Sequence, residues 1–378
     1  MRVALTLISL TGVGGAQRLS LEMYRALRDL DYEVGLFTAS FSERAWEMLT
    51  SGMNGIPRPV VLGEPLISRL FSMTGLLRQK LLVASYLVRS LKPYYDLVIE
   101  TQSDVPLRWA DATYVHFPLA GLLKFYLEHQ YRLRLYERAY LSLLAWMARA
   151  LSGDARPVMT NSTWTARYIR EAYGSQRVYV VHPPVNVEEL SSIGGDRGRI
   201  VLTVSRIAPD KMVTEIPKVA RLVPDAEFYL VGATGPVSGP ILRELKRRSE
   251  GLNNFHLETD VPRKRILELM SQASIYLHPP LPEHFGIAIA EAAAAGLVPV
   301  VYRDGGGWTD IVSRIDEGLG YTSVEEAAHI IRSLLNDAGR LKELSAKARE
   351  VAKGFSYERF KERLDEVIKE LAGPKAKS

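Results

Sequence analysis

The sequence of 378 residues contains no cysteine and only seven histidines. The absence of cysteine excludes disulfides, thiolate nucleophiles and metal sites with cysteine ligands. The histidines are scattered and form no H-E-x-x-H or similar cluster, so we expect no metal site. No window approaches the roughly 18 uninterrupted apolar residues that cross a membrane, and the chain opens on a strand pattern instead of a secretory leader. We therefore expect a cytoplasmic protein.

Apolar residues make up 47% of the chain and charged residues 24%, which is typical of a folded soluble protein. At roughly 100–200 residues per domain, the length indicates two domains. The net charge of +5 is unevenly placed, because residues 51–150 alone contain 12 basic and 7 acidic side chains. A basic balance is the usual electrostatic mark of nucleic-acid binding. Its confinement to one stretch favours a local explanation, and we predict no nucleic-acid partner.

Short apolar strands alternate with helical segments along most of the chain. The strand Arg2–Leu10 is followed by a glycine-rich turn and a helical pattern that ends near Leu30. The alternation stops in a stretch rich in proline, serine and glycine and restarts at Ile200. Such alternation predicts an α/β protein with parallel, doubly wound sheets. We predict two Rossmann-like domains facing across a cleft: a first domain at 1–185, a linker at 186–199, a second domain at 200–355, and a final helix at 356–378 that returns to the first domain.

Two long helical segments, residues 66–91 and 119–150, lie in the basic stretch. In each, apolar and aromatic residues recur at helical spacing with arginines and lysines beside them. Basic rims beside an apolar face suit an anionic membrane surface. Two ordinary helices that face the core, with solvated arginines, are the alternative. Both interpretations remain open at this point. The apolar stripe of the first segment comprises Leu66, Leu70, Leu77, Leu81, Ala84, Val88 and Leu91.

The glycine turn contains Gly12, Gly14 and Gly15 between a strand and a helix. There, bare backbone amides and the helix dipole can approach an anion without obstruction by a Cβ atom. A nicotinamide site would need G-x-G-x-x-G/A and an acidic residue at the end of the second strand. The sequence has Gln17 and Thr38 at those places, which disfavours an oxidoreductase.

The most specific motif is P-E-H-F-G-I-A-I-A-E at 282–291, which places Glu283 and Glu291 eight residues apart. We expect Gly286 to open a helix, with Glu283 in the preceding loop and Glu291 inside the helix among small apolar residues. A carboxylate there is costly unless it has a polar partner, and the hydroxyls of a nucleotide ribose would be one. The free amides at a helix start, here Phe285–Ile287, can hold hydroxyls or phosphate oxygens.

Two cations, Arg206 and Lys211, follow the first strand of the second predicted domain. Loops at the carboxyl edge of a parallel sheet border the crevice in which ligands of such folds bind. The pair would neutralise a diphosphate there. The alternative is that both are ordinary surface charges.

Taken in order, the motifs resemble those of the retaining glycosyltransferases of family 4, which have the GT-B fold. Within that family, Y-V-H-F-P at 114–118 and E-H-F-G-I at 283–287 are most similar to the GDP-mannose-dependent mannosyltransferases of dolichol-linked oligosaccharide synthesis. The resemblance covers nearly the whole chain. It rests on G-G-A-Q-R at 14–18, N-S at 161–162, P-P-V at 183–185, S-R-x4-K at 205–211, L-V-G at 230–232, E-x7-E at 283–291 and G-G-G-W-T-D-I-V at 305–312.

The resemblance implies a role for each matched residue. Gly14 and Gly15 would contact the donor phosphate through the backbone, and Arg206 and Lys211 would bind the diphosphate. Glu291 would bind the ribose, and Val261 would contact the base through its backbone. Glu283, with the amides of Phe285, Gly286 and Ile287, would hold the hydroxyls of the donor sugar, and His116 would touch that sugar or its phosphate. A packed, purely structural His116 is the alternative.

Some positions depart from the family pattern or take no part in it. Met212 stands where glycine usually follows the phosphate-binding lysine, and Ser205 stands where glycine usually precedes the arginine. Neither change removes a charged group. His182, His256 and His278 are interpreted as structural.

The implied reaction is the retaining transfer of a hexose, with mannose from GDP-mannose favoured, to a lipid-linked saccharide. Arg206, Lys211 and the Gly15 amide would replace the divalent metal of other glycosyltransferases, so no metal or other cofactor is expected. The enzyme would be peripheral on the cytoplasmic membrane face, docked through 66–91 and 119–150. Three alternatives stay open: a UDP-sugar-dependent relative with a soluble or polysaccharide acceptor, a nucleotide-sugar epimerase, and a non-catalytic nucleotide-sugar-binding protein.

Overall fold

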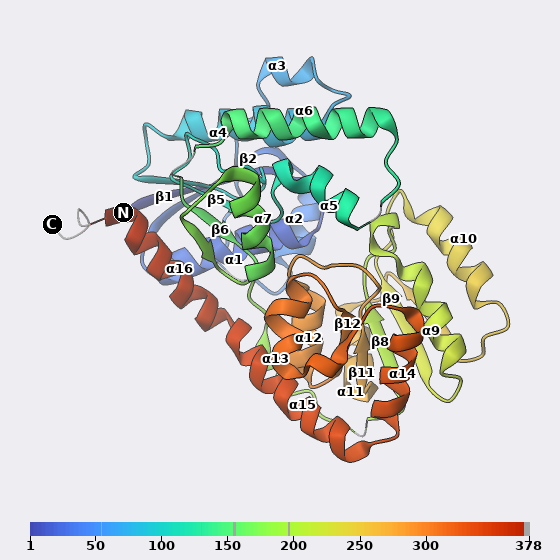
Figure 1. Cartoon of the computed structure of the whole chain (residues 1–378). Helices are drawn as coiled ribbons and strands as arrows, with labels where there is room; N and C mark the ends of the chain where they lie inside the picture. Colours follow the sequence, from blue (N-terminus) through green and yellow to red (C-terminus); the bar gives the residue numbers. More distant parts are fainter. Residues whose placement is uncertain (54, 130, 154–155, 196, 374–378) are drawn as a thin grey trace. The chain divides into compact units, whose positions relative to one another are not determined.

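The computed structural model describes residues 1–53, 55–129, 131–153, 156–195 and 197–373. The chain divides into two compact units, of which unit 1 comprises Met1–Pro183 with the stretch from Glu358 onward and unit 2 comprises Pro184–Tyr357. Each unit contains one parallel sheet with helices on both faces (Figure 1). The two α/β units with parallel sheets predicted from the strand–helix alternation are thereby confirmed.

Unit 1 is built on a seven-stranded sheet with the order β3-β2-β1-β4-β5-β6-β7. The interior strand β1 (Arg2–Leu10) is buried along almost its whole length, as expected for a parallel strand covered on both faces. The other strands are β2 (Glu33–Phe41), β3 (Val60–Val61), β4 (Leu97–Glu100), β5 (Ala112–Val115), β6 (Val158–Thr160) and β7 (Val178–Val180). The helices are α1 (Gly15–Asp29), α2 (Glu43–Thr50), α3 (Leu66–Arg69), the π-helix η1 (Leu77–Val83), α4 (Ala84–Leu91), η2 (Leu119–Gly121), α5 (Leu122–Glu128), α6 (Leu135–Leu151) and α7 (Thr163–Tyr173).

Unit 2 contains a six-stranded sheet with the order β10-β9-β8-β11-β12-β13. Its strands are β8 (Ile200–Val204), β9 (Glu227–Gly232), β10 (Phe255–Thr259), β11 (Ile275–Leu277), β12 (Val298–Tyr302) and β13 (Gly320–Tyr321). The main helices are α8 (Val187–Ser191), α9 (Ile216–Leu222), α10 (Ser238–Ser249), α11 (Arg263–Gln272), α12 (Ile287–Ala295), α14 (Val324–Leu335) and α15 (Ala338–Ala352). Short helical turns complete it: η3 (Pro209–Lys211), η4 (Val213–Glu215), η5 (Gly307–Val312), α13 (Ser313–Ile315), η6 (Glu317–Leu319) and η7 (Lys353–Phe355).

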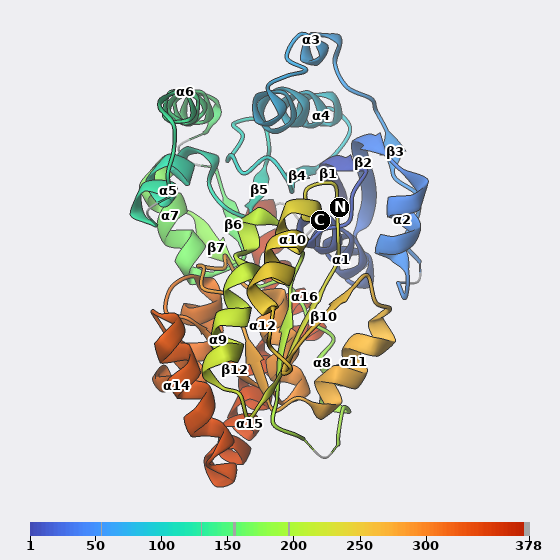
Figure 2. The same cartoon turned by 90° about the vertical axis from the view of Figure 1, so that its right-hand side faces the viewer.

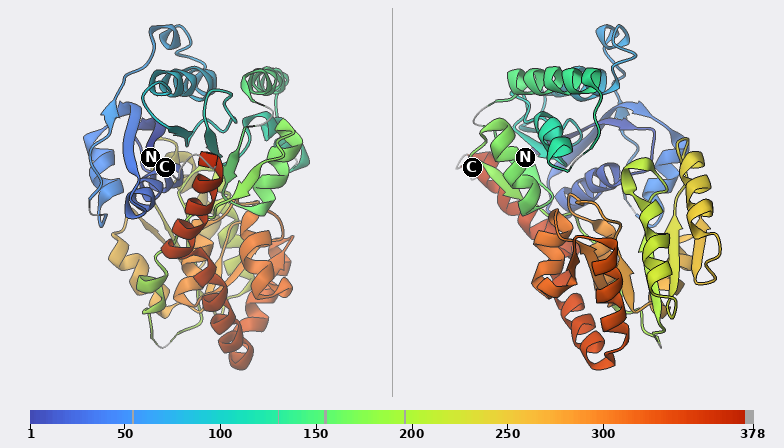
Figure 3. Two further views of the ribbon diagram at one scale, coloured as in Figure 1. Left: turned by 90° about the vertical axis from the view of Figure 1, so that its left-hand side faces the viewer. Right: turned by 45° about the vertical axis from the view of Figure 1, so that its right-hand side comes forward.

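The last helix, α16 (Tyr357–Ala372), joins unit 1 from Glu358 onward (Figure 3). The hydroxyl of Tyr32 in unit 1 donates to Asp365 at 3.1 Å, and the Arg363 side chain donates to the carbonyl of Val180 in β7 at 3.2 Å. Buried Phe360 and Leu364 supply the apolar side of the contact. The helix therefore completes a unit whose other residues precede it by more than 170 positions.

The predicted linker 186–199 lies within unit 2. It contains helix α8, whose Leu190 is fully buried in the core of that unit. Arg197 donates to the carbonyls of Met270 at 3.0 Å and Ala295 at 2.5 Å, in the last turns of α11 and α12, where carbonyls lack helical partners. Proline, serine and glycine interrupt the strand–helix alternation here, but the stretch packs as part of the second unit.

The two basic segments are divided into shorter helices. The stripe from Leu77 to Leu91 is buried in the core of unit 1, whereas Leu66 and Leu70 are 76% and 81% exposed. For 77–91 the core-facing alternative is therefore correct, because these residues cover the sheet beneath them. None of the helices within the described ranges has the length and apolar character needed to span a membrane.

Candidate functional site

The sheet order of unit 2 places three polar loops side by side. Strand β11 lies between β8 and β12, and the carboxyl ends of parallel strands meet at one edge of a sheet. The loop after β8 carries Arg206 and Lys211, the loop after β11 carries Glu283, and the loop after β12 carries three consecutive glycines that begin at Gly305. The edge thus gathers residues that are up to 100 positions apart in sequence.

Lys211 and Glu283 form the central ion pair of this edge. The Nζ atom of Lys211 lies 2.8 Å from Oε2 of Glu283, and the side chains are 19% and 21% exposed. The backbone of Glu283 is fixed as well, since its carbonyl accepts from the amide of Gly306 at 2.7 Å. At Gly305, φ is +93°, and a Cβ atom would lie 2.6 Å from the Glu283 backbone. Only glycine fits there, which explains one residue of the G-G-G-W motif.

Glu283 is held ionised. Burial alone would raise the pKa of its carboxyl group, but the neighbouring Lys211 and the nearby His278 and His284 outweigh that effect and hold the pKa well below its usual range. An ionised carboxylate only accepts hydrogen bonds. Glu283 can therefore accept from hydroxyls of a bound ligand, and it is poorly suited to act as a general acid.

His278 belongs to the same group, although sequence analysis interpreted it as structural. Its ring is 5% exposed, and Nε2 lies 3.6 Å from Oε2 of Glu283, which is too long for a hydrogen bond. Among the described residues, Nε2 has no hydrogen-bond partner. The available signal was its place directly after strand β11, the same kind of position that singled out Arg206.

Helix α12 begins beside Glu283 as the motif predicts. Gly286 precedes the helix with φ +89°, and a Cβ atom there would lie 2.6 Å from Cδ1 of Ile289. No side chain caps this helix start in the described part of the chain. The dipole and amides of the first turn are therefore directed at the same edge that holds Glu283.

Arg206 and Glu291 form ion pairs with residues outside the central pair. Glu291 is 13% exposed and forms an ion pair with Arg263 of α11 at 3.2 Å, so it already has the polar partner that its apolar surroundings demand. Arg206 is 60% exposed and pairs with Asp210 at 3.1 Å. Val261 is partly buried in the loop after β10. A ribose at Glu291 would have to share this carboxylate with Arg263 or displace it.

In unit 1, the glycine turn leaves open space at its backbone. A Cβ atom on Gly12 would meet nothing within 4 Å, and Gly14 has an extended backbone with φ −160°. A Cβ atom on Gly14 would lie 2.9 Å from Oε1 of Gln17, at the end of a flexible side chain, so only a movement of that side chain would be needed. Helix α1 starts directly afterwards at Gly15 without a side-chain cap. The arrangement is suited to the close approach of an anion to the backbone.

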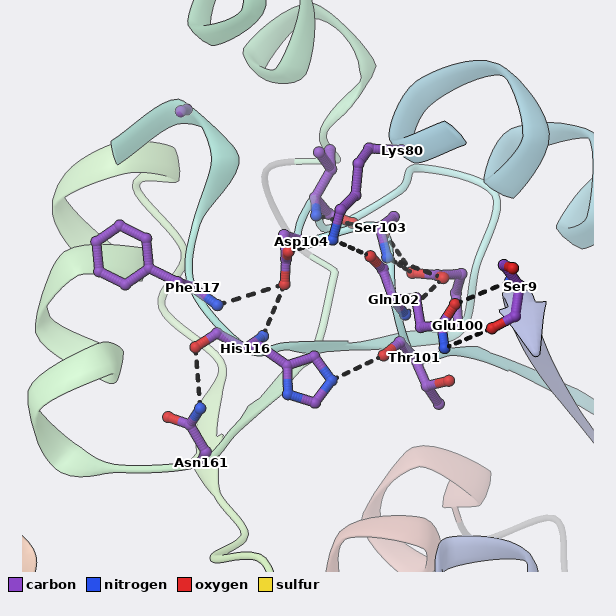
Figure 4. Close-up of polar contacts among 12 residues, drawn as sticks. Ser9, Lys80, Glu100, Thr101, Gln102, Ser103, Asp104, His116, Phe117 and Asn161 are labelled. Atoms are coloured by element: carbon purple, nitrogen blue, oxygen red, sulfur yellow. Dashed lines mark hydrogen bonds and ion pairs between the residues drawn. The ribbon is translucent and has the colours of Figure 1, made fainter. Parts of the chain in front are cut away.

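His116 follows β5 at the same edge of the unit 1 sheet and is held by three hydrogen bonds (Figure 4). Its backbone amide donates to Asp104 at 2.9 Å, its carbonyl accepts from the side chain of Asn161 at 2.9 Å, and its Nε2 lies 3.0 Å from the carbonyl oxygen of Thr101. Burial lowers the pKa of His116, against the opposing influence of Asp104. The ring is therefore fixed and favoured in its neutral form.

Gly14, Gly15 and His116 thus belong to unit 1, and the other predicted site residues belong to unit 2. The structure brings Lys211 and Glu283 into direct contact, with the start of α12 beside them. The roles assigned to all of these residues remain predictions. Among the described residues there is no group of three or more histidine, aspartate or glutamate side chains arranged to hold a metal ion.

Comparison with protein families gives two adjoining matches. Residues 13–189 match the model described as "Glycosyltransferase Family 4", and residues 188–351 match "Glycosyl transferases group 1". Together the two models cover nearly the whole chain.

Curated relatives with the same name occur in several eukaryotes. The chain is 26% identical over 255 residues to the "GDP-Man:Man(3)GlcNAc(2)-PP-Dol alpha-1,2-mannosyltransferase" of Dictyostelium discoideum, covering 61% of this chain and 50% of that protein. It is 28% identical over 279 residues to the protein of that name from Neurospora crassa, covering 64% and 50%. The chain spans about half the length of the curated relatives it matches.

Solved structures share the fold at low sequence identity. Sucrose-phosphate synthase from Thermosynechococcus elongatus matches with a TM-score of 0.74 at 15% identity, covering 98% of this chain and 99% of that one. HepE from Anabaena, in complex with UDP and glucose, matches with a TM-score of 0.69 at 17% identity, covering 97% and 99%. The family matches, the order of the motifs and this common fold agree, and the chain belongs to glycosyltransferase family 4 with the GT-B fold.

Proposed function

We propose that the protein transfers a hexose from a nucleotide-diphosphate sugar to a lipid-linked saccharide with retention of configuration. Mannose from GDP-mannose is the favoured donor, because the curated relatives are named as mannosyltransferases that use GDP-mannose and a dolichol-linked acceptor. The transfer needs no metal and takes place at the cytoplasmic face of a membrane.

The observation that carries the proposal is the Lys211–Glu283 ion pair at the edge of the unit 2 sheet. Both side chains are partly exposed, so a ligand can reach them. A diphosphate would take the ammonium group of Lys211, and hydroxyls of the donor sugar would donate to the ionised Glu283. One pair thus supplies a cation for the leaving group and an acceptor for the sugar.

The cations act where negative charge grows. As the bond between the anomeric carbon and the phosphate oxygen breaks, the sugar gains oxocarbenium character and the nucleoside diphosphate gains negative charge. Groups that stabilise this developing charge lower the barrier. Lys211, Arg206 and the amide of Gly15 are proposed for this role. The acceptor hydroxyl attacks the same face that the diphosphate leaves, and its proton passes to the departing phosphate.

The low pKa of Glu283 bears on the alternative of a covalent intermediate. Its pairing with Lys211 makes the carboxylate a weaker nucleophile than a free one. The front-side route therefore suits this site better than the double displacement of retaining glycosidases, in which a second carboxylate attacks the sugar.

Exposed apolar side chains on unit 1 support docking to an anionic membrane. They lie around α3 and on α6; Figure 2 shows α3 above α4 and α6 beside α4, on the same side of unit 1. The arginines Arg69, Arg134, Arg138 and Arg149 are exposed on the same two segments. We call this set the α3–α6 surface; its apolar members are Leu66 (76% exposed), Ile67 (56%), Leu70 (81%), Met73 (98%), Leu135 (85%), Tyr136 (63%), Leu143 (50%) and Trp146 (66%).

The donor is tested by thermal shift against a panel of GDP-, UDP-, ADP- and TDP-sugars, since a ligand that binds only the folded state raises its stability. GDP-mannose should give the largest increase in melting temperature. A larger increase with UDP-sugars would replace the mannose proposal by the UDP-sugar-dependent alternative.

The reaction is tested by product analysis with the best donor, a lipid-linked saccharide acceptor and EDTA. The expected product carries the hexose in the anomeric configuration of the donor. An epimer formed from donor alone would indicate the epimerase, and donor binding without nucleotide release in any acceptor mixture would indicate a non-catalytic binding protein. Loss of activity in EDTA would contradict metal independence.

Docking is tested by flotation with liposomes that contain anionic lipid. The double variant Leu70→Ser/Trp146→Ser should float less than the parent. Met48→Ser, which removes a 59% exposed methionine on α2, is the matched control and should float like the parent. Equal flotation of all three proteins would remove the α3–α6 surface from the proposal.

A further inference from the structure

A second ion pair, Lys80–Asp104, lies at the edge of the unit 1 sheet. Asp104 also accepts from the backbone amide of His116, but the ion pair itself has no role in the site described so far. Nζ of Lys80 is 2.5 Å from Oδ2 of Asp104, and the side chains are 24% and 15% exposed. The ammonium group also donates to the carbonyl of Gln102 at 2.6 Å. Lys80 comes from the π-helical segment η1, and Asp104 comes from the loop after β4, so the pair ties a helix to the end of a strand.

The other carboxylate oxygen of Asp104 holds the backbone at His116. Oδ1 accepts from the amide of His116 at 2.9 Å and from the amide of Phe117 at 3.3 Å. Figure 4 shows the carboxylate between these two amides and Lys80. Asp104 thereby fixes the chain direction at the point where it leaves β5.

Asp104 also adopts a backbone conformation that side chains rarely take. Its φ is +59°, in the left-handed region that favours glycine and costs most other residues energy. Glycine would satisfy the backbone but would lose every contact of the carboxylate. Aspartate at position 104 instead keeps a side chain that joins η1 to the segment after β5.

The ring of His116 is oriented from the same loop. Nε2 lies 3.0 Å from the carbonyl oxygen of Thr101, and a carbonyl oxygen only accepts, so Nε2 carries the proton. In the neutral ring Nδ1 is then an acceptor. Within the described ranges, no residue donates a hydrogen bond to Nδ1.

We propose that the Lys80–Asp104 pair is a positioning device that holds His116 as a neutral acceptor for a hydroxyl of the donor sugar. Lys80 and Asp104 touch no substrate; they act through the loop that fixes both the backbone and the ring of His116. The inference rests on the proposed function and makes it more specific. A ring with an open Nδ1 acceptor suits a hydroxyl donor and repels a phosphate oxygen, so His116 contacts the sugar and not the diphosphate.

A matched control lies at the opposite end of the same strands. Asp111 also accepts from a backbone amide, that of Val98 at 2.7 Å, and forms an ion pair with Lys92. It precedes β5 and so lies at the amino edge of the sheet, remote from His116 in register. The variant Asp111→Asn therefore removes the same kind of interaction from the same unit without touching the positioning of His116.

The test combines an NMR measurement with kinetics on Asp104→Asn, Lys80→Met, Asp111→Asn and the parent. In protein labelled with ¹⁵N-histidine, long-range ¹H–¹⁵N spectra report which ring nitrogen carries the proton, and His116→Gln assigns the signal. The parent should show His116 protonated on Nε2 alone. Asp104→Asn and Lys80→Met should show mixed tautomers and a kcat on the order of ten- to a hundredfold lower, because small misplacements of reacting groups have effects of this size. KM for the donor should change less than about threefold, since the diphosphate contacts remain.

The proposal is overturned if Asp104→Asn and Lys80→Met retain the parent tautomer and kcat, or if Asp111→Asn lowers kcat as much as they do. A thermal melt of each variant shows that it is folded. The NMR measurement of the His116 tautomer uses no donor. A parent that transfers no hexose would therefore refute the proposed function, whereas the NMR result tests the positioning of His116 independently.

Discussion

Glu100 is fully buried and Glu283 is 21% exposed, and both lie near the carboxyl ends of parallel strands, yet their pKa values move in opposite directions. Burial raises the pKa of Glu100 to about 7, against opposing hydrogen bonds from Ser103 and the amide of Gln102. The pKa of Glu283 is well below its usual range because the cations around it outweigh its burial. The partners of Glu100 are neutral amides and a hydroxyl, and the nearest partner of Glu283 is an ammonium group.

The difference separates the tasks of the two sheet edges. The unit 1 edge uses its polar groups to hold its own loops in place. Glu100 and Asn161 bond backbone or hydroxyl groups nearby, and Asp104 bonds backbone amides as well as the ammonium group of Lys80. At the unit 2 edge, Lys211 and Glu283 pair with each other and are 19% and 21% exposed, so a ligand can exchange with them. We infer that Glu100 and the Lys80–Asp104 pair of unit 1 position the loops of that unit, and that Lys211 and Glu283 of unit 2 bind the ligand directly.

The largest expected effect comes from breaking the charged edge. Lys211→Ala should lower kcat/KM for transfer by about 10³-fold, a typical loss when a group that stabilises transition-state charge is removed. Lys218→Ala, which removes an exposed lysine paired with Glu215 at 2.7 Å in the same unit, should change kcat/KM less than about twofold. Transfer rates for the folded variants measure this. A Lys211→Ala variant as active as the parent would refute the assignment of the diphosphate site.

A smaller effect is expected from neutralising the buried carboxyl group of unit 1. The folded state holds the proton of Glu100 more tightly than the unfolded chain does. The contribution of Glu100 to the free energy of unfolding therefore falls by about 3 kcal/mol as pH rises from about 4.5 to about 7. Glu100→Gln should flatten this dependence. Hydrogen exchange of the β4 amides at pH 5 and pH 8 reports on unit 1 alone, and identical pH dependence in parent and variant would contradict the raised pKa.

The smallest effect is expected at Glu291, whose carboxylate is already paired with Arg263. Glu291→Gln should raise KM for the donor about tenfold with little change in kcat, since a ribose contact far from the reacting bond binds ground state and transition state alike. Arg263→Ala should leave KM within about threefold of the parent. Steady-state kinetics over a range of donor concentrations distinguish the two variants, and a kcat that falls in proportion to KM would place Glu291 in the chemistry instead.

Much of the fold was predictable because strand–helix alternation and glycine turns are local signals. The two parallel sheets and the helix after Gly286 follow from them. The orientation of the basic segments did not, because a helical stripe such as Leu77–Leu91 has the same pattern whether it covers a sheet or a membrane. Only the packing of unit 1 distinguishes these cases.

Single site residues were predictable where a sequence motif identifies them. Contacts between residues that only the folded sheet brings together were not predictable. The E-x7-E spacing identifies Glu283, and the strand-end position identifies Lys211. Their direct ion pair depends on β8 and β11 being neighbours, which the sequence does not state. Asp104 escaped prediction because its role follows from a left-handed backbone angle and from contacts with η1 and the end of β5.

The most direct test of the division between the two edges is calorimetric titration with the nucleoside diphosphate of the best donor, applied to the parent, Lys211→Ala and Asp104→Asn. Lys211→Ala should bind it at least about thirtyfold more weakly, since truncation of one partner of a charged contact costs about 2 kcal/mol or more. The affinity of Asp104→Asn should lie within about threefold of that of the parent, because the Asp104 loop is proposed to position His116 toward the sugar and not toward the diphosphate. Equal losses in both variants, or no loss in Lys211→Ala, would contradict the account.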